Sequence, residues 1–148
     1  MAWIGISYWK DKLIIPNSAT TTTGIGIPIA PVDIIDSKDK KGLIKVIRER
    51  IPKKEIIIPH PKQDEWKSIA HPSSQAVGYK SWKKFDKETK MQLGIGIREK
   101  DVVIGTYQKP TRGYEWIAKE DEQTINIKDP EIIAEYVIKE IEKIDKDE

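Results

Sequence analysis

Hydrophobic and polar residues alternate along the first part of the chain, and this alternation predicts β-strands. Residues 2–9 alternate, residues 10–12 are polar, and residues 13–15 are apolar again before Pro16. The arrangement predicts a β-hairpin that ends at Pro16. In residues 25–29, Ile alternates with Gly and Pro, which predicts an edge strand because Pro cannot donate a ladder hydrogen bond.

Helical spacing replaces the alternation in the next segment. Apolar residues recur at helical intervals between residues 43 and 51, after an Asp36-Ser37 pair suited to an N-cap and before Pro52. We therefore expect a helix near residues 38–51. A short apolar strand is expected at residues 55–58.

Residues 59–78 are rich in Pro, Ser and Gly and are expected to form the longest irregular segment of the chain. The next residues, 81–87, predict a short helix with Ser81 as its N-cap. Trp82 and Phe85 lie three positions apart and would share one face of this helix.

The pattern of residues 91–127 predicts an antiparallel β-meander. Residues 91–97 alternate strictly, and a polar turn leads to a returning strand at 102–107. A third strand is expected at 114–118 and a fourth at 124–127. The two Gly of the first strand, Gly94 and Gly96, do not fit a phosphate-binding loop. We expect them to give the strand a flat face or to allow a neighbour to approach closely.

The C-terminal segment predicts an amphipathic helix near residues 130–145. Asp129 is a good N-cap residue, Pro130 occupies the favoured first position, and an apolar stripe follows at helical spacing. Because an isolated helix of this length is marginal in water, the stripe should pack on the meander. The prediction is a single α+β domain over residues 1–148.

The composition excludes several kinds of site but does not identify a function. The chain has 148 residues, no Cys and a net charge of +2. The absence of Cys excludes disulfides, thiolate zinc sites, iron–sulfur clusters and a Cys nucleophile. The near-zero charge argues against a dedicated polycationic nucleic-acid binder. The N-terminus does not resemble a signal peptide, and the chain lacks an apolar run of membrane-spanning length, so we expect a cytoplasmic protein without a membrane partner.

The sequence does not single out a catalytic, cofactor-binding or metal-binding residue, and we expect no cofactor. An enzyme using His60 and His71, with Asp64 and Glu65 nearby, is one alternative. Both His precede Pro in the irregular segment, and their spacing matches no metal-binding motif. The other interpretation of these residues is two surface loop histidines.

Residues 79–90 interleave five Lys with three aromatic residues. Such a stretch could hold phosphates while an aromatic ring stacks on a base, which makes a single-stranded nucleic-acid-binding module the second alternative. The helical spacing of Trp82 and Phe85 favours an amphipathic element instead, with the aromatic rings buried and the Lys in water.

The opening Met-Ala-Trp-Ile-Gly-Ile-Ser, the Val77–Phe85 segment and the overall layout resemble immunity proteins of contact-dependent and other polymorphic toxin systems. The resemblance implies a small cytosolic α+β protein that binds a cognate toxin domain, often a nuclease, and blocks it. Immunity proteins against nucleases are often markedly acidic, and this chain departs from that pattern. Our leading hypothesis is a non-catalytic protein-binding module of this kind, with an unassigned oligomeric state. Its candidate partner-binding residues are aromatic or charged, namely Tyr79, Lys80, Trp82, Lys83, Glu120, Asp121 and Glu122.

Overall fold

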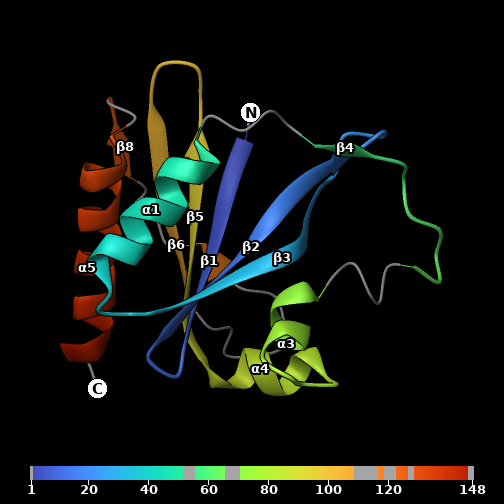
Figure 1. Ribbon diagram of the computed structural model, residues 1–148, viewed down its shortest axis with the longest axis horizontal. Helices are drawn as coiled ribbons and strands as arrows, with labels where there is room; N and C mark the ends of the chain where they lie inside the picture. Colours follow the sequence, from blue (N-terminus) through green and yellow to red (C-terminus); the bar gives the residue numbers. More distant parts are fainter. Residues whose placement is uncertain are drawn as a thin grey trace.

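The computed structural model describes residues 2–51, 56–65, 71–108, 117–118, 123–126 and 129–146. Its eight strands form one sheet in the order β3-β2-β1-β5-β6-β7, in which β4 also pairs with β2 and β8 also pairs with β6 (Figure 1). The strands are β1 (Ala2–Trp9), β2 (Lys12–Thr21), β3 (Gly26–Asp36), β4 (Ile57–Ile58), β5 (Thr89–Ile97), β6 (Val102–Gln108), β7 (Ile117–Ala118) and β8 (Gln123–Ile125). The predicted α+β fold class is confirmed.

The predicted N-terminal hairpin is present, but its second strand is longer than expected. Lys10 and Asp11 form the two-residue turn, and both have positive φ angles, as a tight hairpin with primed turn geometry requires. The strand β2 then continues through Pro16 to Thr21. The register with β3 shifts between Pro16 and Asn17, because Pro16 pairs with Val32 and Asn17 with Ile29, so the two extra residues, Ala30 and Pro31, are in β3. The strand predicted at residues 25–29 is the beginning of β3, which lies at the edge of the sheet as expected.

Two helices cover one face of the sheet and close the main hydrophobic core. They are α1 (Lys40–Arg50) and α5 (Pro130–Lys146), which lie side by side. The N-cap of α1 is Asp39, not the expected Asp36-Ser37 pair, because its carboxylate accepts the Gly42 N–H. The Asp129 carboxylate accepts the Glu131 N–H at the start of α5, as predicted. The stripe of α5 packs on the sheet through Ile133, Val137 and Ile141.

The other face of the sheet carries two short helices, α3 (Pro72–Ala76) and α4 (Trp82–Glu88). The helix α4 begins at the predicted Ser81 cap, whose hydroxyl accepts the Lys83 N–H. The prediction that residues 59–78 are irregular is wrong for α3. Pro72 provides the favoured first helical residue, and the Ser74 hydroxyl donates to the His71 carbonyl oxygen, so a short helix forms within the Pro- and Ser-rich stretch.

The predicted meander needs one correction. The third and fourth strands were expected to be successive neighbours, but β7 and β8 both pair with β6, β7 at Tyr107–Gln108 and β8 at Val102–Ile104. They therefore follow one another along the same edge of β6. Two short apolar segments separated by polar residues cannot be told from two full strands by alternation alone.

A buried arginine connects α1 to β2 beside the point where the register with β3 shifts. The Arg50 side chain is only 7% exposed. Its guanidinium donates to the Ile15 and Pro16 carbonyl oxygens and pairs with the Asp33 carboxylate on β3. The helix thus contributes side-chain hydrogen bonds to β2 next to this irregularity.

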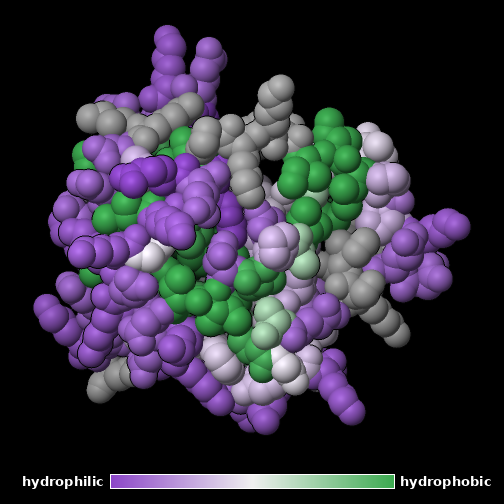
Figure 2. Space-filling model, viewed as in Figure 1, coloured by the Kyte–Doolittle hydropathy of each residue, from purple (hydrophilic) through white to green (hydrophobic). Residues whose placement is uncertain are grey.

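An exposed hydrophobic patch lies over β4 and the β2–β3 turn, at the upper right of the surface in Figure 2. Its residues are Ile25, Ile56 and Ile57, of which Ile57 is 66% exposed. Within the described residues, we find no helix with the length and hydrophobicity needed to span a bilayer.

The first strand and the last helix are joined by a buried tyrosine. The Tyr8 side chain is fully buried, and its hydroxyl donates to the Asp145 carboxylate over 2.8 Å. Burial and, next, the Asp145 carboxylate raise the pKa of Tyr8 well above its ordinary value.

Because folded Tyr8 keeps its proton where unfolded tyrosine loses it, its contribution to stability is complete below about pH 10 and is lost as the pH rises further. We expect Tyr8→Phe to lower the free energy of unfolding by about 1 kcal/mol at pH 7 through the lost hydrogen bond. The difference between wild type and variant should shrink above about pH 10, as urea unfolding at pH 7, 9, 10 and 11 can measure. A constant difference at all four pH values would contradict this assignment.

Candidate functional site

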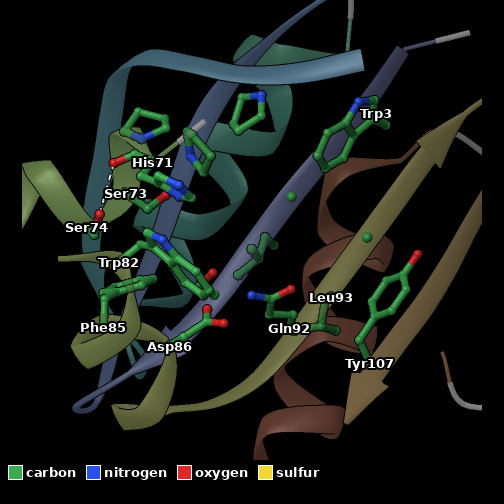
Figure 3. A pocket seen from close by; sticks show the side chains of 17 residues that line it. Trp3, His71, Ser73, Ser74, Trp82, Phe85, Asp86, Gln92, Leu93 and Tyr107 are labelled. Atoms are coloured by element: carbon green, nitrogen blue, oxygen red, sulfur yellow. Dashed lines mark hydrogen bonds between the residues drawn. The ribbon is translucent and has the colours of Figure 1, made fainter. Parts of the chain in front are cut away.

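The face of the sheet opposite the main core is the candidate site. Side chains alternate between the two faces along β1, β5 and β6, and those that do not enter the core point to this side. The helices α3 and α4 cover only one end of it. Figure 3 shows the uncovered part as a cleft with His71, Trp82 and Phe85 on one side and Trp3 and Tyr107 on the other. The cleft has a volume of about 480 Å³, which is within the range of ligand and peptide pockets.

A row of glycines forms the floor of this cleft. Gly5 of β1 pairs with Gly94 of β5, which in turn pairs with Gly105 of β6. Gly96 lies one step further along the same face of β5. The Tyr107 ring borders Gly94, where a Cβ would lie 3.4 Å from it, which is an ordinary contact distance.

Aromatic side chains form the walls. The Trp3 ring lies over Gly5, where a Cβ would come within 2.6 Å of it, and the Trp3 indole nitrogen also borders Gly26. Both Trp3 and Tyr107 are 37% exposed. A second hollow of about 360 Å³ shares Trp3, Gly94 and Tyr107 with the first and extends to Arg98 and Val103. The two hollows therefore adjoin on the same face of the sheet.

The end of the cleft beside α3 and α4 is more polar. The His71 and Trp82 rings stack with centroids 5.2 Å apart and planes 14° apart. Burial lowers the pKa of His71, and the Asp86 carboxylate partly opposes this shift. Ser7 and Gln92 also line this end. The cleft thus combines ring surfaces with a few hydrogen-bonding groups.

The structure places the predicted site residues in different parts of the molecule. Trp82 lines the cleft, and Lys80 and Lys83 are exposed. Tyr79 lies outside the cleft: its hydroxyl donates to Glu88, its ring packs edge-on against Trp9, and the Lys84 ammonium lies 5.0 Å from the ring centroid. Tyr79 is therefore part of a structural cluster. The acidic stretch Glu120, Asp121 and Glu122 lies outside the described residues.

The amphipathic interpretation of residues 79–90 is confirmed for Phe85 and for the lysines of α4, whereas Trp82 lines the cleft and does not enter the core. Phe85 is buried, Trp82 is half-buried against His71, and Lys80, Lys84 and Lys87 are exposed.

The structure does not bring the two histidines together. His60 lies at the β2–β3 turn, where its Nδ1 is 2.9 Å from the Thr23 hydroxyl, whereas His71 lines the cleft. Among the described residues, no three His, Asp or Glu side chains group as a metal site would require.

Sequence reasoning missed Trp3, Gly105 and Tyr107. These residues come together only through the pairing of β1 with β5 and of β5 with β6. The available signal was that each of these three strands carries Gly at positions alternating with core residues.

Neither a protein-family model nor a curated protein matches this chain. Three solved chains match it in structure. One of them, described as a protein of unknown function, NMB0488 from Neisseria meningitidis, has a TM-score of 0.63 and 15% sequence identity, with 93% of this chain and 92% of that chain covered. The two proteins share a fold over nearly their whole lengths.

Proposed function

We propose that this protein is a non-catalytic binding module of the immunity-protein type, which acts in the cytoplasm by covering the active site of a cognate bacterial toxin domain. The observation that carries the proposal is the cleft with its glycine floor and its exposed Trp3 and Tyr107 rings. Exposed aromatic residues beside a shaped hollow are typical of binding hot spots on protein surfaces.

The position of the cleft suits occlusion by a preformed surface. Its floor is the backbone of three central strands, whose other face is packed against α1 and α5. A site built on such a sheet changes little on binding. A partner that covered the cleft and its surroundings over an interface of about 1,600 Å² in total would have its own active site shielded from substrate. A nuclease domain is one such toxin.

We expect this protein to restore growth of bacteria that express the toxin domain encoded beside its gene, and to co-elute with that domain in size-exclusion chromatography. Tyr107→Ser should abolish protection, because it removes an exposed wall of the cleft with little loss of core packing. Lys45→Ala is the matched control, since Lys45 is exposed on α1, over the opposite face of the sheet. Growth arrest that persists beside wild-type protein, with separate elution of the two chains, would overturn the proposal.

A nucleic-acid-binding module is the second candidate, and the exposed lysines of α4 beside the cleft favour it. This second function predicts that the protein binds single-stranded RNA or DNA and that its affinity falls steeply between 50 and 200 mM salt. Against it, two of the three aromatic residues of this stretch are engaged within the fold: Phe85 is buried and Tyr79 packs on Trp9. Gel-shift assays at both salt concentrations separate the two functions.

A further inference from the structure

One acidic side chain lies in the wall of the larger hollow. Asp86 lines it from α4, on the same side of the helix as Trp82 and Phe85, because residues three and four positions apart share a helical face. Among the described residues that line this hollow, only Asp86 and His71 can carry a charge near neutral pH. Burial lowers the pKa of His71 and favours its neutral form, so the Asp86 carboxylate supplies the charge.

The lysines that lie near Asp86 in the sequence do not enter this hollow. Among the described residues, no Lys or Arg lines it. The Lys84 ammonium lies 5.0 Å from the centre of the Tyr79 ring, and the Lys90 ammonium lies 5.4 Å from the centre of the Tyr8 ring. Both rings lie outside the hollow. The charge within the described walls is therefore negative, and its complement is a cationic group.

A row of hydrogen-bonding side chains crosses the floor next to this carboxylate. Ser7 of β1 pairs with Gln92 of β5, which in turn pairs with Tyr107 of β6, and all three line the hollow. Figure 3 shows the Asp86 carboxylate and the Gln92 amide directed into the cleft. Carboxylate, amide and hydroxyl oxygens all accept hydrogen bonds. This end of the cleft thus offers several acceptors to a single donor-rich group.

Ring faces border these acceptors. The stacked His71 and Trp82 rings lie on one side of the cleft, and Trp3 and Tyr107 lie on the other. A guanidinium is planar, carries five N–H donors and stacks on aromatic rings, whereas an ammonium is a compact and strongly hydrated charge. The combination of acceptors and rings therefore fits a guanidinium better than an ammonium.

We propose that this end of the cleft binds an arginine side chain of the protein partner, whose guanidinium pairs with the Asp86 carboxylate, donates to Gln92 and packs on the Trp82 ring. The inference rests on the proposed function in that the arginine belongs to a protein segment. Arginine is among the residues that dominate binding energy at protein interfaces, and its pairing with a carboxylate adds geometric specificity. Asp86 and Gln92 thereby join Trp82 as partner-binding residues.

The test measures binding of the peptide acetyl-Gly-Arg-Gly-amide, at millimolar concentration, to ¹⁵N-labelled protein by NMR. We expect the indole N–H signal of Trp82 and the side-chain amide signals of Gln92 to shift. Asp86→Asn should weaken the affinity about tenfold, because it removes the charge of the pair. Glu49→Gln is the matched control: it removes an exposed carboxylate on α1, over the opposite face of the sheet, and should bind as wild type does.

Two further peptides change the ligand and leave the protein as it is. Acetyl-Gly-citrulline-Gly-amide has the shape of the arginine peptide without its charge, and acetyl-Gly-Lys-Gly-amide has the charge without the planar fork. Both should bind at least about fivefold more weakly than the arginine peptide, because each lacks one of the two properties that the site recognises.

Several results would overturn the inference. Equal affinity for the arginine and citrulline peptides would remove the charge from recognition, and equal affinity for the lysine peptide would remove the planar fork. No binding to wild-type protein, or unchanged affinity in Asp86→Asn, would remove Asp86 from recognition. Protection from toxin by wild-type protein is measured separately, so the inference can fail while the proposed function stands. A bound arginine peptide without protection would count against the proposed function alone.

Discussion

Replacing Arg50 with methionine is expected to lower the free energy of unfolding by about 3 kcal/mol, because the substitution removes the buried guanidinium hydrogen bonds to two carbonyl groups of β2. Methionine keeps much of the side-chain volume, so the loss reports hydrogen bonds and not a cavity. The carboxylate of Asp33 is 46% exposed and can be rehydrated, so it adds little to the cost.

Urea unfolding followed by circular dichroism measures this loss. Arg48→Met is the matched control on the same helix, since Arg48 is exposed, and it should change stability by less than about 0.5 kcal/mol. Arg50→Lys should fall between the two, because an ammonium cannot reproduce the fork that reaches Ile15, Pro16 and Asp33 together. A loss below about 1 kcal/mol for Arg50→Met would show that the irregular pairing of β2 with β3 is stable without the guanidinium.

Truncation of Ile133 to alanine should cost about 3 kcal/mol, and truncation to valine about 1 kcal/mol. Ile133 is fully buried where α5 meets the sheet, in the same core cluster as Leu93 and Ile95 of β5. The cavity that alanine leaves is surrounded by side chains from two layers, which cannot collapse together without moving the helix.

The same unfolding experiment measures both variants. Glu142→Ala on the exposed side of α5 is the control and should be nearly neutral. Equal stabilities of Ile133→Ala and this control would contradict the packing of α5 on the sheet.

Elements whose pattern is local were predictable from the sequence. The strict alternation of residues 91–97 became β5, and the cap and stripe of residues 129–145 became the start and the buried face of α5. In both cases the buried face follows from the period of the apolar residues, independently of what they pack against.

Features that depend on distant partners were not predictable. Pro16 was taken as the end of a strand, because a proline removes a ladder donor. The strand continues because β3 contains two extra residues opposite this point and the Arg50 guanidinium, 34 positions further along the chain, donates to the Pro16 carbonyl oxygen. The burial of Arg50 itself could not be predicted, since an arginine at a helix end is ordinarily exposed.

The same distinction between local patterns and distant partners applies to the candidate site. Trp82 was identified from its helical spacing with Phe85, a local signal, and it lines the cleft. Tyr79 was identified from its residue type alone and is engaged in a structural cluster. Trp3 and Tyr107 belong to strands on either side of β5, so only the strand order places them on one cleft.

The pairing of β1 with β5 also has a consequence for how the chain is made. These strands join residues about 90 positions apart, a separation at which contacts form slowly. At a synthesis rate of about 5–20 residues per second, β1 leaves the ribosome roughly 5–20 s before β5 does. During that interval Ile4 and Ile6, which the finished fold buries, have neither their β5 neighbours nor α5 to cover them. The nascent N-terminal half therefore exposes apolar side chains that chaperones can bind.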